Sequence, residues 1–451
     1  MSDNRLDNLT VDEDSAGYTS AVKIDSIKFK NYKFFYGDFE LPVNGKNLLV
    51  YGENGSGKSA ICRALELLTQ NSFIDFDKNL NIFAADKNAE VEFGFNNGKE
   101  LIITSDLEKM PDHVDFINGL SIFKPMLDYK KLLKVHYAPE VNGDRINLYY
   151  MFRKLLNDYP VKVNDEKIKL SSIKDFNVYF KALDEILKGE FLSSINSFLK
   201  KYFDADIFIE KFEFKTEIDE KSSMAVPIIN LSIDYKEYLI DKYHTFLNEA
   251  RLSALAISIY MVAIKKLLDM LETDCLKMLV LDDLLISLDM SNRLKLPEIL
   301  KNEFKDFQIF FFTHDKELFE IYKDKMDWEK YEIYLDDSRG IPMAILKQGR
   351  SELERAKMFY AQKEYDACAL LLRKGFEKKL KSYLTTAEQR NKNCEELDLA
   401  GLIGRAISKS SGESENILQK LNSDRQHILN PLCHIHTKTI HSEELGSVDI
   451  W

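Results

Sequence analysis

The chain has 451 residues, enough for about three domains of ordinary size, with 45% hydrophobic and 30% charged residues. This composition is typical of a globular protein and excludes a mainly disordered or collagen-like chain. The net charge of −12 argues against a protein that simply coats nucleic acid. Five scattered cysteines without a CxxC pair argue against a disulfide framework and indicate a reducing cytoplasm.

The predicted elements follow from apolar periodicity, taken in chain order. Residues 1–20 are acidic and polar and are predicted to be a mobile tail rather than a signal peptide. No apolar run is long enough to predict a membrane span. Strands are predicted over 21–51, 90–104, 207–215, 226–235, 278–281 and 308–314. Helices are predicted over 58–69, 128–137, 146–159, 168–202 and 248–272, and throughout the last hundred residues.

A phosphate-binding loop is predicted directly after the strand NLLVY, where GENGSGKS fits the pattern GxxxxGKS and opens a helix. Lys58 is expected to reach the β- and γ-phosphates of ATP, and the hydroxyl of Ser59 to ligate Mg²⁺. The alternative is a glycine turn that matches by chance. The predicted cofactor-binding residues of this loop are Gly52, Glu53, Asn54, Gly55, Ser56, Gly57, Lys58, Ser59 and Ala60.

A second acidic element follows the apolar strand MLVL at 278–281. Asp282 is placed to hold Mg²⁺ through water, and Asp283 to polarise the attacking water. Many strands end in Asp, so this pattern is informative only together with the loop at 52–59.

These motifs, with Ser287-Leu288-Asp289 and then a strand ending in Thr313-His314, resemble the heads of ABC-type ATPases of the RecF/SMC/Rad50 branch. The opening FKNYKFF is also similar to that branch. The resemblance implies an α/β fold with an ABC-type P-loop ATPase head. It implies that Asp289 belongs to the D-loop at a dimer interface and that His314 contacts the γ-phosphate. A satisfied core histidine is the alternative for His314.

The family's signature sequence is predicted at Leu247–Arg251, before a long helix. It is degenerate, but Asn248 still offers a side-chain donor to a γ-phosphate, beside a helix N-terminus. The alternative is that Asn248 only caps a core helix. The stretch Asp128-Tyr129-Lys130 is the candidate for the family's Q-loop, although it contains no glutamine.

The predicted domains are the tail, the ATPase head over 21–345, and a C-terminal helical domain over 350–451. The head has a helical insert at about 138–205, whose longest helix of about 30 residues spans roughly 45 Å. This is far shorter than the coiled coils of SMC and Rad50 proteins. The basic runs Lys124–Lys134 and Arg373–Lys381 are either solvated faces or nucleic-acid patches.

The C-terminal block resembles HEPN-type bundles, many of which are ribonucleases. Asn430 and His434 fit the catalytic pattern of that family, but Leu429 stands where it has Arg, and Arg425 comes four residues too early. We therefore expect an inactive HEPN-like bundle, with an unrelated interaction bundle as the alternative. The cluster of Cys433, His434, His436 and His441 lacks a second ligand pair, so zinc is not favoured.

The resemblance to compact antiphage ATPases of the PARIS and Septu type predicts a sensor or switch subunit that hydrolyses ATP with Mg²⁺. The expected partners are a second copy in an ATP-sandwiched homodimer or a higher homo-oligomer, and a separate nuclease effector. A nucleic acid or a phage protein is the expected trigger, and no membrane is involved. The alternatives are a RecF-like DNA repair ATPase and an ATP-gated ribonuclease toxin.

Overall fold

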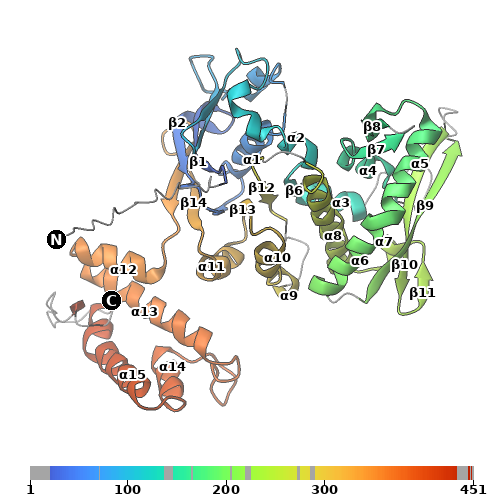
Figure 1. Cartoon of the computed structure of the whole chain (residues 1–451). Coiled ribbons are helices and arrows are strands. Elements are labelled where there is room, and N and C mark those ends of the chain that lie inside the picture. The colour runs from blue at the N-terminus through green and yellow to red at the C-terminus, as the bar shows by residue number, and fades with distance from the viewer. Residues whose placement is uncertain are drawn as a thin grey trace, which may run out of the picture. The chain divides into compact units, whose positions relative to one another are not determined.

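The computed structural model describes residues 21–70, 72–136, 146–163, 166–203, 206–218, 225–271, 275–284, 290–433, 445–446 and 448 (Figure 1). The chain forms two compact units. The first runs up to Phe319 and includes Ile333–Leu346, and the second combines Glu320–Glu332 with the chain from Lys347 onward. Within the described residues, no helix is both long and apolar enough to cross a membrane.

A six-stranded sheet forms the centre of the first unit, in the order β15-β14-β3-β13-β12-β6. Its strands are β3 (Leu48–Gly52), β6 (Met126–Asp128), β12 (Met278–Asp282), β13 (Gln308–Thr313), β14 (Glu329–Asp336) and β15 (Met343–Gln348). The pairs β3·β13, β13·β12 and β12·β6 are parallel, and every residue of β3 and β13 is buried. Short apolar runs of this kind are expected in parallel strands covered on both faces.

An antiparallel sheet, β2-β1-β4-β5, precedes most of the central sheet in the chain. Its strands are β1 (Ile24–Tyr32), β2 (Phe35–Pro42), β4 (Glu90–Phe95) and β5 (Glu100–Ile103). The side chain of Gln308, at the start of β13, accepts a hydrogen bond from Ile24 N at 2.7 Å and donates to Ile24 O at 2.7 Å and Lys46 O at 3.0 Å. Gln308 is fully buried, so these bonds fix where the two sheets meet.

Helix α8 (Glu249–Leu268) is buried over every residue from Leu252 to Ile264. An apolar helix without a polar face belongs in a core. It packs against α2 (Leu120–Phe123), α3 (Tyr129–His136) and α6 (Leu192–Phe198). The other helices near the central sheet are α1 (Lys58–Leu67), α9 (Met290–Arg293), α10 (Leu296–Glu303) and α11 (Lys316–Lys325), whereas α7 (Tyr243–Phe246) contacts β10 (Ala225–Tyr235).

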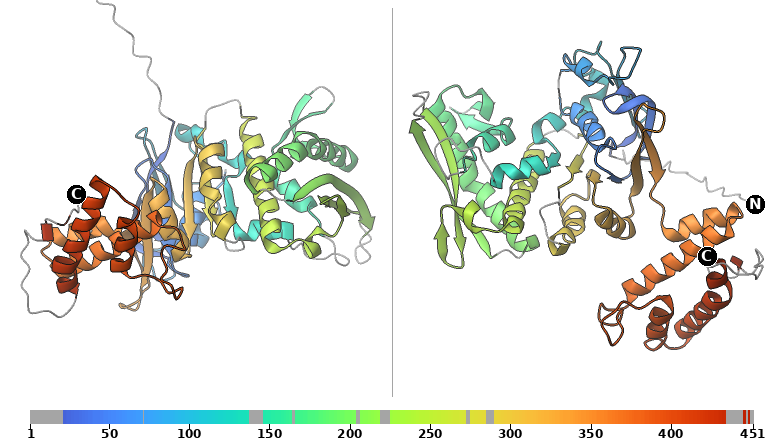
Figure 2. Two further views of the ribbon diagram at one scale, coloured as in Figure 1. Left: turned by 90° about the horizontal axis from the view of Figure 1, so that it is seen from below. Right: turned by 180° about the vertical axis from the view of Figure 1, so that it is seen from behind.

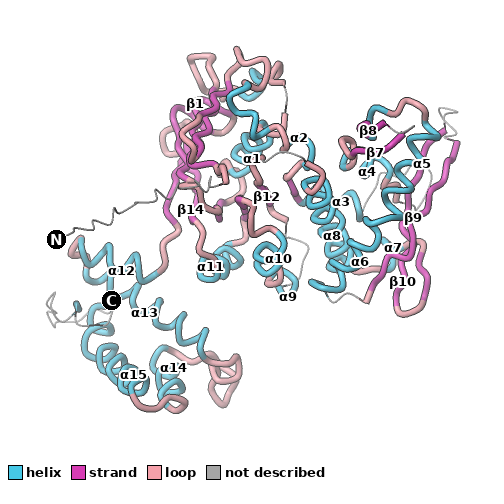
Figure 3. Tube along the Cα trace, in the orientation of Figure 1, coloured by secondary structure: helices cyan, strands magenta, loops and turns pink. Residues whose placement is uncertain are grey.

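The insert contains both helices and strands (Figures 2 and 3). Helix α4 (Tyr149–Leu155) precedes the hairpin β7 (Pro160–Val163) and β8 (Glu166–Lys169), and α5 (Phe176–Ile186) and α6 follow. The chain then forms a three-stranded sheet of β9 (Ile207–Ile218), β10 (Ala225–Tyr235) and β11 (Tyr238–Ile240). The helical turns Leu187–Phe191 and α6 pack against β9.

The prediction of one helix over 168–202 is wrong at its beginning and in its middle. Lys169 ends β8, and α5 begins only after Asp175, whose side chain accepts a hydrogen bond from Val178 N at 2.9 Å. The helix is interrupted by a π-helical turn, in which Gly189 has non-helical dihedral angles. Glycine has little helix propensity, and this position marks the break.

The second unit is helical over its described part beyond Arg350, apart from one bridge between Arg390 and Glu396. Its helices are α12 (Glu352–Ala361), α13 (Tyr365–Tyr383), α14 (Leu399–Ile407), α15 (Glu413–Asp424) and α16 (Asn430–Cys433). A capping box at Ser351 and Glu354 begins α12. Leu429 is fully buried in an apolar cluster that includes Cys368 and Leu372.

Candidate nucleotide site

The loop between β3 and α1 depends on glycines at Gly55 and Gly57, whose φ angles are 83° and 106°. These angles lie in the left-handed region that other residues rarely adopt. A Cβ atom on Gly57 would also lie 2.6 Å from Cδ1 of Phe34. The residues predicted from GENGSGKS are therefore folded as a tight loop that ends at the N-terminus of α1.

Lys58 lies inside this loop and is only 5% exposed. Its ammonium group donates to Gly52 O at 2.6 Å and to Glu53 O at 3.2 Å. No carboxylate of the described residues forms an ion pair with it, so its charge remains available to an anion. The hydroxyl of Ser56 is buried and has no hydrogen-bond partner within the described part of the chain. An unpartnered donor beside an unneutralised ammonium fits a phosphate group.

Asp282, the last residue of β12, carries a buried carboxylate oxygen without a partner among the described residues. Burial, with the neighbouring charge of Asp283, raises the pKa of Asp282 to about 6, whereas Lys58 opposes this rise. Burial and Asp282 also raise the pKa of the Cys62 thiol. A carboxylate that is hard to ionise without a nearby cation fits a site for a bound metal ion.

The described residues contain no cluster of three or more His, Cys, Asp or Glu side chains that could hold a metal ion alone. Magnesium sites beside phosphates need fewer protein ligands, because the phosphates and water supply the rest. Ser59 and Asp282 line the same cavity, of about 300 Å³, as Asp283. The predicted pair Ser59 and Asp282 therefore fits Mg²⁺ bound together with nucleotide phosphates.

Asp283 and His314 form a direct pair at the carboxyl edge of the sheet. One carboxylate oxygen, Oδ1 of Asp283, accepts from His314 N at 2.9 Å and is 2.8 Å from His314 Nδ1. A carboxylate without a proton can only accept, so Nδ1 then carries the hydrogen of this bond. The backbone of Asp283 is left-handed, with φ of 48°, and its N–H donates to Phe312 O at 3.0 Å. These contacts hold the carboxylate of Asp283 in place on a backbone conformation that is unfavourable for most residues.

Asp128 joins the site, although the sequence indicated only the stretch around it and did not single it out. It ends β6 in parallel register with Asp282, and its charge contributes to the raised pKa of Asp282. Its Oδ1 accepts from Lys131 N at 2.7 Å. A strand of three residues is too short to show periodicity, so only the order of strands in the sheet reveals this carboxylate.

Other predicted residues lie apart from this group or outside the described residues. Asn248 is exposed and caps α8, accepting from Arg251 N at 3.0 Å. It does not line the cavity beside Asp282. Its role towards a γ-phosphate therefore stays a prediction. Asp289 and the rest of the predicted D-loop lie outside the described residues.

In the C-terminal unit, the buried position of Leu429 would not accommodate a guanidinium group without a partner. Arg425 is bonded instead to Oδ1 of Asn422, at 3.2 Å and 3.1 Å. His434, His436 and His441 lie outside the described residues. Of these three histidines and Cys433, which the sequence places close together but does not favour as a zinc site, only Cys433 is described, and burial raises the pKa of its thiol.

Comparison with known proteins gives likenesses at the level of structure alone. No family model matches the chain, and no curated protein matches it. An Smc head bound to the C-winged helix domain of ScpA is similar, with 10% identity, 74% of this chain, 99% of that chain and a TM-score of 0.43. An SMC head domain from Thermotoga maritima has 14% identity and a TM-score of 0.37, and the match covers 72% of this chain and 99% of that chain. The recombination mediator protein RecF has 15% identity and a TM-score of 0.40, and the match covers 72% of this chain and 99% of that chain. At these TM-scores, only the site's own geometry carries an argument about function.

The raised pKa of Asp282 predicts how its replacement changes stability without ligands. The folded state binds a proton at Asp282 more tightly than the unfolded state, whose value is about 3.8, so stability falls as pH rises from about 4 to about 6. Asp282→Asn should therefore raise the free energy of unfolding at pH 7 by about 1–3 kcal/mol, and the gain should shrink at pH 4. Urea denaturation at both pH values measures this, and a variant less stable than the wild type at pH 7 would contradict it.

Proposed function

We propose that the chain is an ABC-type ATPase that binds Mg–ATP at the carboxyl edge of its central sheet. One observation supports this most strongly: the ammonium of Lys58, which has no ion pair among the described residues, and the unpartnered hydroxyl of Ser56 lie in one loop, and the charge of Lys58 acts on Asp282, whose Oδ1 has no partner among the described residues. An anion-binding group and a cation-binding group in such proximity suit a ligand that carries both, as a magnesium nucleotide does.

Binding rests on groups that are already in position. The N-terminus of α1 and the loop amides attract phosphate oxygens, and Lys58 can exchange its bonds to Gly52 O and Glu53 O for a phosphate. Bound Mg²⁺ would neutralise part of the negative charge of the nucleotide phosphates. Asp282 and Ser59 would hold the ion, and Asp282 then ionises at lower pH because a cation stands beside it.

Hydrolysis needs a group that orients water beside the γ-phosphate, and we assign this role to Asp283. Its Oδ1 is engaged by His314, which leaves Oδ2 to accept a hydrogen bond from water. His314 holds the carboxylate in one orientation, and in this proposal it also contacts the γ-phosphate. Because the backbone at Asp283 is left-handed, its side chain takes a direction that a continuing strand after Asp282 would not give it.

A complete site in this proposal needs a second copy of the chain. Asn248 is exposed at the N-terminus of α8 and does not line the cavity at its own Asp282. Presented by a second copy, it would add a donor and a helix N-terminus to the γ-phosphate. A homodimer with two sandwiched nucleotides, or a higher homo-oligomer built from such dimers, satisfies both copies by symmetry.

At a finer level, we propose a sensor or switch subunit of an antiphage defence system that controls a separate nuclease. The short insert and the helical second unit support a switch rather than a long DNA tether. Buried Leu429 in place of a catalytic Arg supports an effector on another chain. A RecF-like repair ATPase would use the same site. Co-purification of a nuclease with the chain favours the defence role, whereas loading at DNA gaps favours repair.

Two substitutions should separate binding from hydrolysis. Lys58→Ala removes the charge that meets the phosphates and should weaken ATP binding by roughly 100-fold or more. Asp283→Asn keeps the shape of the site but loses the water-orienting charge, so it should bind ATP normally and hydrolyse it at least about 100-fold more slowly. Fluorescent-nucleotide binding and phosphate release measure both, with Lys181→Ala as a control on an exposed helix of the insert. Hydrolysis by Asp283→Asn at the wild-type rate would exclude this role for Asp283.

The purified chain alone should cleave neither RNA nor DNA, with or without ATP, because Leu429 leaves a HEPN-type site without its guanidinium group. Incubation with total tRNA and with plasmid, followed by gel analysis, tests this. Cleavage that disappears in His434→Ala would instead identify the second unit as an active nuclease and favour the toxin alternative.

A further inference from the structure

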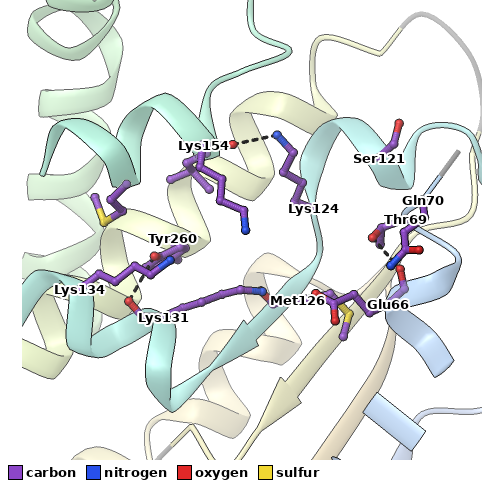
Figure 4. A pocket seen from close by; sticks show the side chains of 12 residues that line it. Glu66, Thr69, Gln70, Ser121, Lys124, Met126, Lys131, Lys134, Lys154 and Tyr260 are labelled. Carbon is purple, nitrogen blue, oxygen red and sulfur yellow. Dashed lines mark hydrogen bonds between the residues drawn. The ribbon is translucent and has the colours of Figure 1, made fainter. Parts of the chain in front are cut away.

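A second pocket, of about 240 Å³, is drawn in Figure 4 and shares lining residues with the cavity beside Asp282. The end of α1, the segment from α2 to β6, and helices α3, α4 and α8 all contribute to its walls. Its common feature is lysine: four of its twelve lining residues are Lys124, Lys131, Lys134 and Lys154. Figure 4 shows Lys131, Lys134 and Lys154 on one side of the pocket and Glu66, Thr69 and Gln70 on the other.

The positive charge of this pocket is only partly neutralised. The ammonium groups of Lys134 and Lys154 have no ion-pair partner among the described residues. Of the described lining residues, Glu66 alone is a carboxylate, and it pairs with Arg63 at 2.5 Å. The pocket therefore has an excess of positive charge at its own walls.

The other two lysines are held in place by carbonyl oxygens. Lys124 Nζ donates to Lys154 O at 2.8 Å and lies 3.4 Å from a carboxylate oxygen of Asp158. Lys131 Nζ donates to Met126 O at 2.7 Å and lies 3.9 Å from Oδ2 of Asp128. Each ammonium has three hydrogens, so donors remain for a ligand.

The lysines of this pocket repel one another, although nearby carboxylates offset part of the repulsion. Burial lowers the pKa of Lys124, Asp158 opposes this, and the charge of Lys154 adds a smaller lowering effect. Burial likewise lowers the pKa of Lys131, Asp128 and Glu66 oppose this, and Lys154 and Lys134 add smaller lowering effects. A bound anion would relieve this repulsion, because it favours the charged form of every lysine around it.

We propose that this pocket binds a compact polyphosphorylated small molecule, at a site separate from the nucleotide site. Lysine ammonium groups are point-charge donors suited to phosphate oxygens. Pockets for drug-sized ligands measure about 300–1,000 Å³, so a cavity of about 240 Å³ suits two or three phosphates with little attached. The lysines converge on one concave site rather than following a stripe, as they would for a nucleic-acid backbone.

This pocket shares walls with the nucleotide site. Glu66, Met126 and Lys131 line both it and the cavity beside Asp282. Lys131 connects the two cavities, because it lines both, and its N–H and its ammonium group both contact Asp128. Ligand binding should therefore change the ATPase rate, a consequence that rests on the proposed function, whereas the binding itself does not.

Isothermal titration calorimetry with inorganic tripolyphosphate tests the site. The protein is first saturated with excess Mg²⁺ and an ATP analogue that is not hydrolysed, so that the nucleotide site is closed to the probe. Wild-type protein should then show one further binding event per chain. Lys134→Gln/Lys154→Gln should weaken it roughly 10-fold or more. Both lysines are exposed, so the double variant should fold, which circular dichroism verifies.

The matched control is Lys174→Gln/Lys181→Gln, which removes the same charge from exposed positions that do not line the pocket and should bind as the wild type does. No further binding, or equal binding by the double variant, would overturn the inference. A third outcome would assign the lysines to nucleic acid instead. In that outcome the wild type and the control variant bind a single-stranded oligonucleotide, Lys134→Gln/Lys154→Gln does not, and none of the three binds tripolyphosphate. Failure of the ATP analogue itself to bind wild-type protein would overturn the proposed function. The lysine pocket would then still be tested by the difference in tripolyphosphate binding between the wild type and the double variant.

Discussion

The parallel register of β3, β13, β12 and β6 is the constraint on which the site depends. Parallel strands bring their carboxyl ends to the same edge, and pairing sets Asp282 opposite both Phe312 and Asp128. Thr313 pairs with Tyr51, so the phosphate-binding loop and His314 begin one step beyond. A shift of one residue in the pairing of β12 with β6 would move Asp282 out of line with Asp128, because side chains alternate between the two faces of a sheet. The buried apolar runs of these strands therefore position the polar site at their ends.

Without a ligand, several features of the site lower the stability of the fold, and each of them favours ligand binding. Asp282 and Ser56 each bury an oxygen without a partner among the described residues, and Asp283 has a left-handed backbone. The two adjacent acids repel, as the raised pKa of Asp282 shows. A nucleotide with its metal would supply a partner for each of these groups, so binding should stabilise the fold as well as fill the site.

The sequence predicted the parts of this site that follow from local pattern. The strand at 278–282, the glycine loop and the helix at Lys58 are all where their patterns indicated, because buried strands and P-loops have strong local signals. It also predicted helix in the second unit correctly.

The parts that depend on tertiary contacts were not predicted. Asp128 becomes a neighbour of Asp282 only through sheet order. The hairpin at 160–169 was not predicted, because two strands of four residues each are too short to show periodicity. The lysine pocket draws Lys124, Lys131 and Lys134 from one basic run but needs Lys154 from another helix, which no run of sequence reveals.

Binding of Mg–ATP at one edge of the central sheet is the property on which the proposed function depends. A crystal or cryo-EM structure with Mg²⁺ and an ATP analogue that is not hydrolysed tests it. We expect a triphosphate at Lys58 and the ion beside Ser59 and Asp282. A protein that binds no nucleotide at saturating concentration, or binds it away from the loop at 52–59, would contradict this proposal.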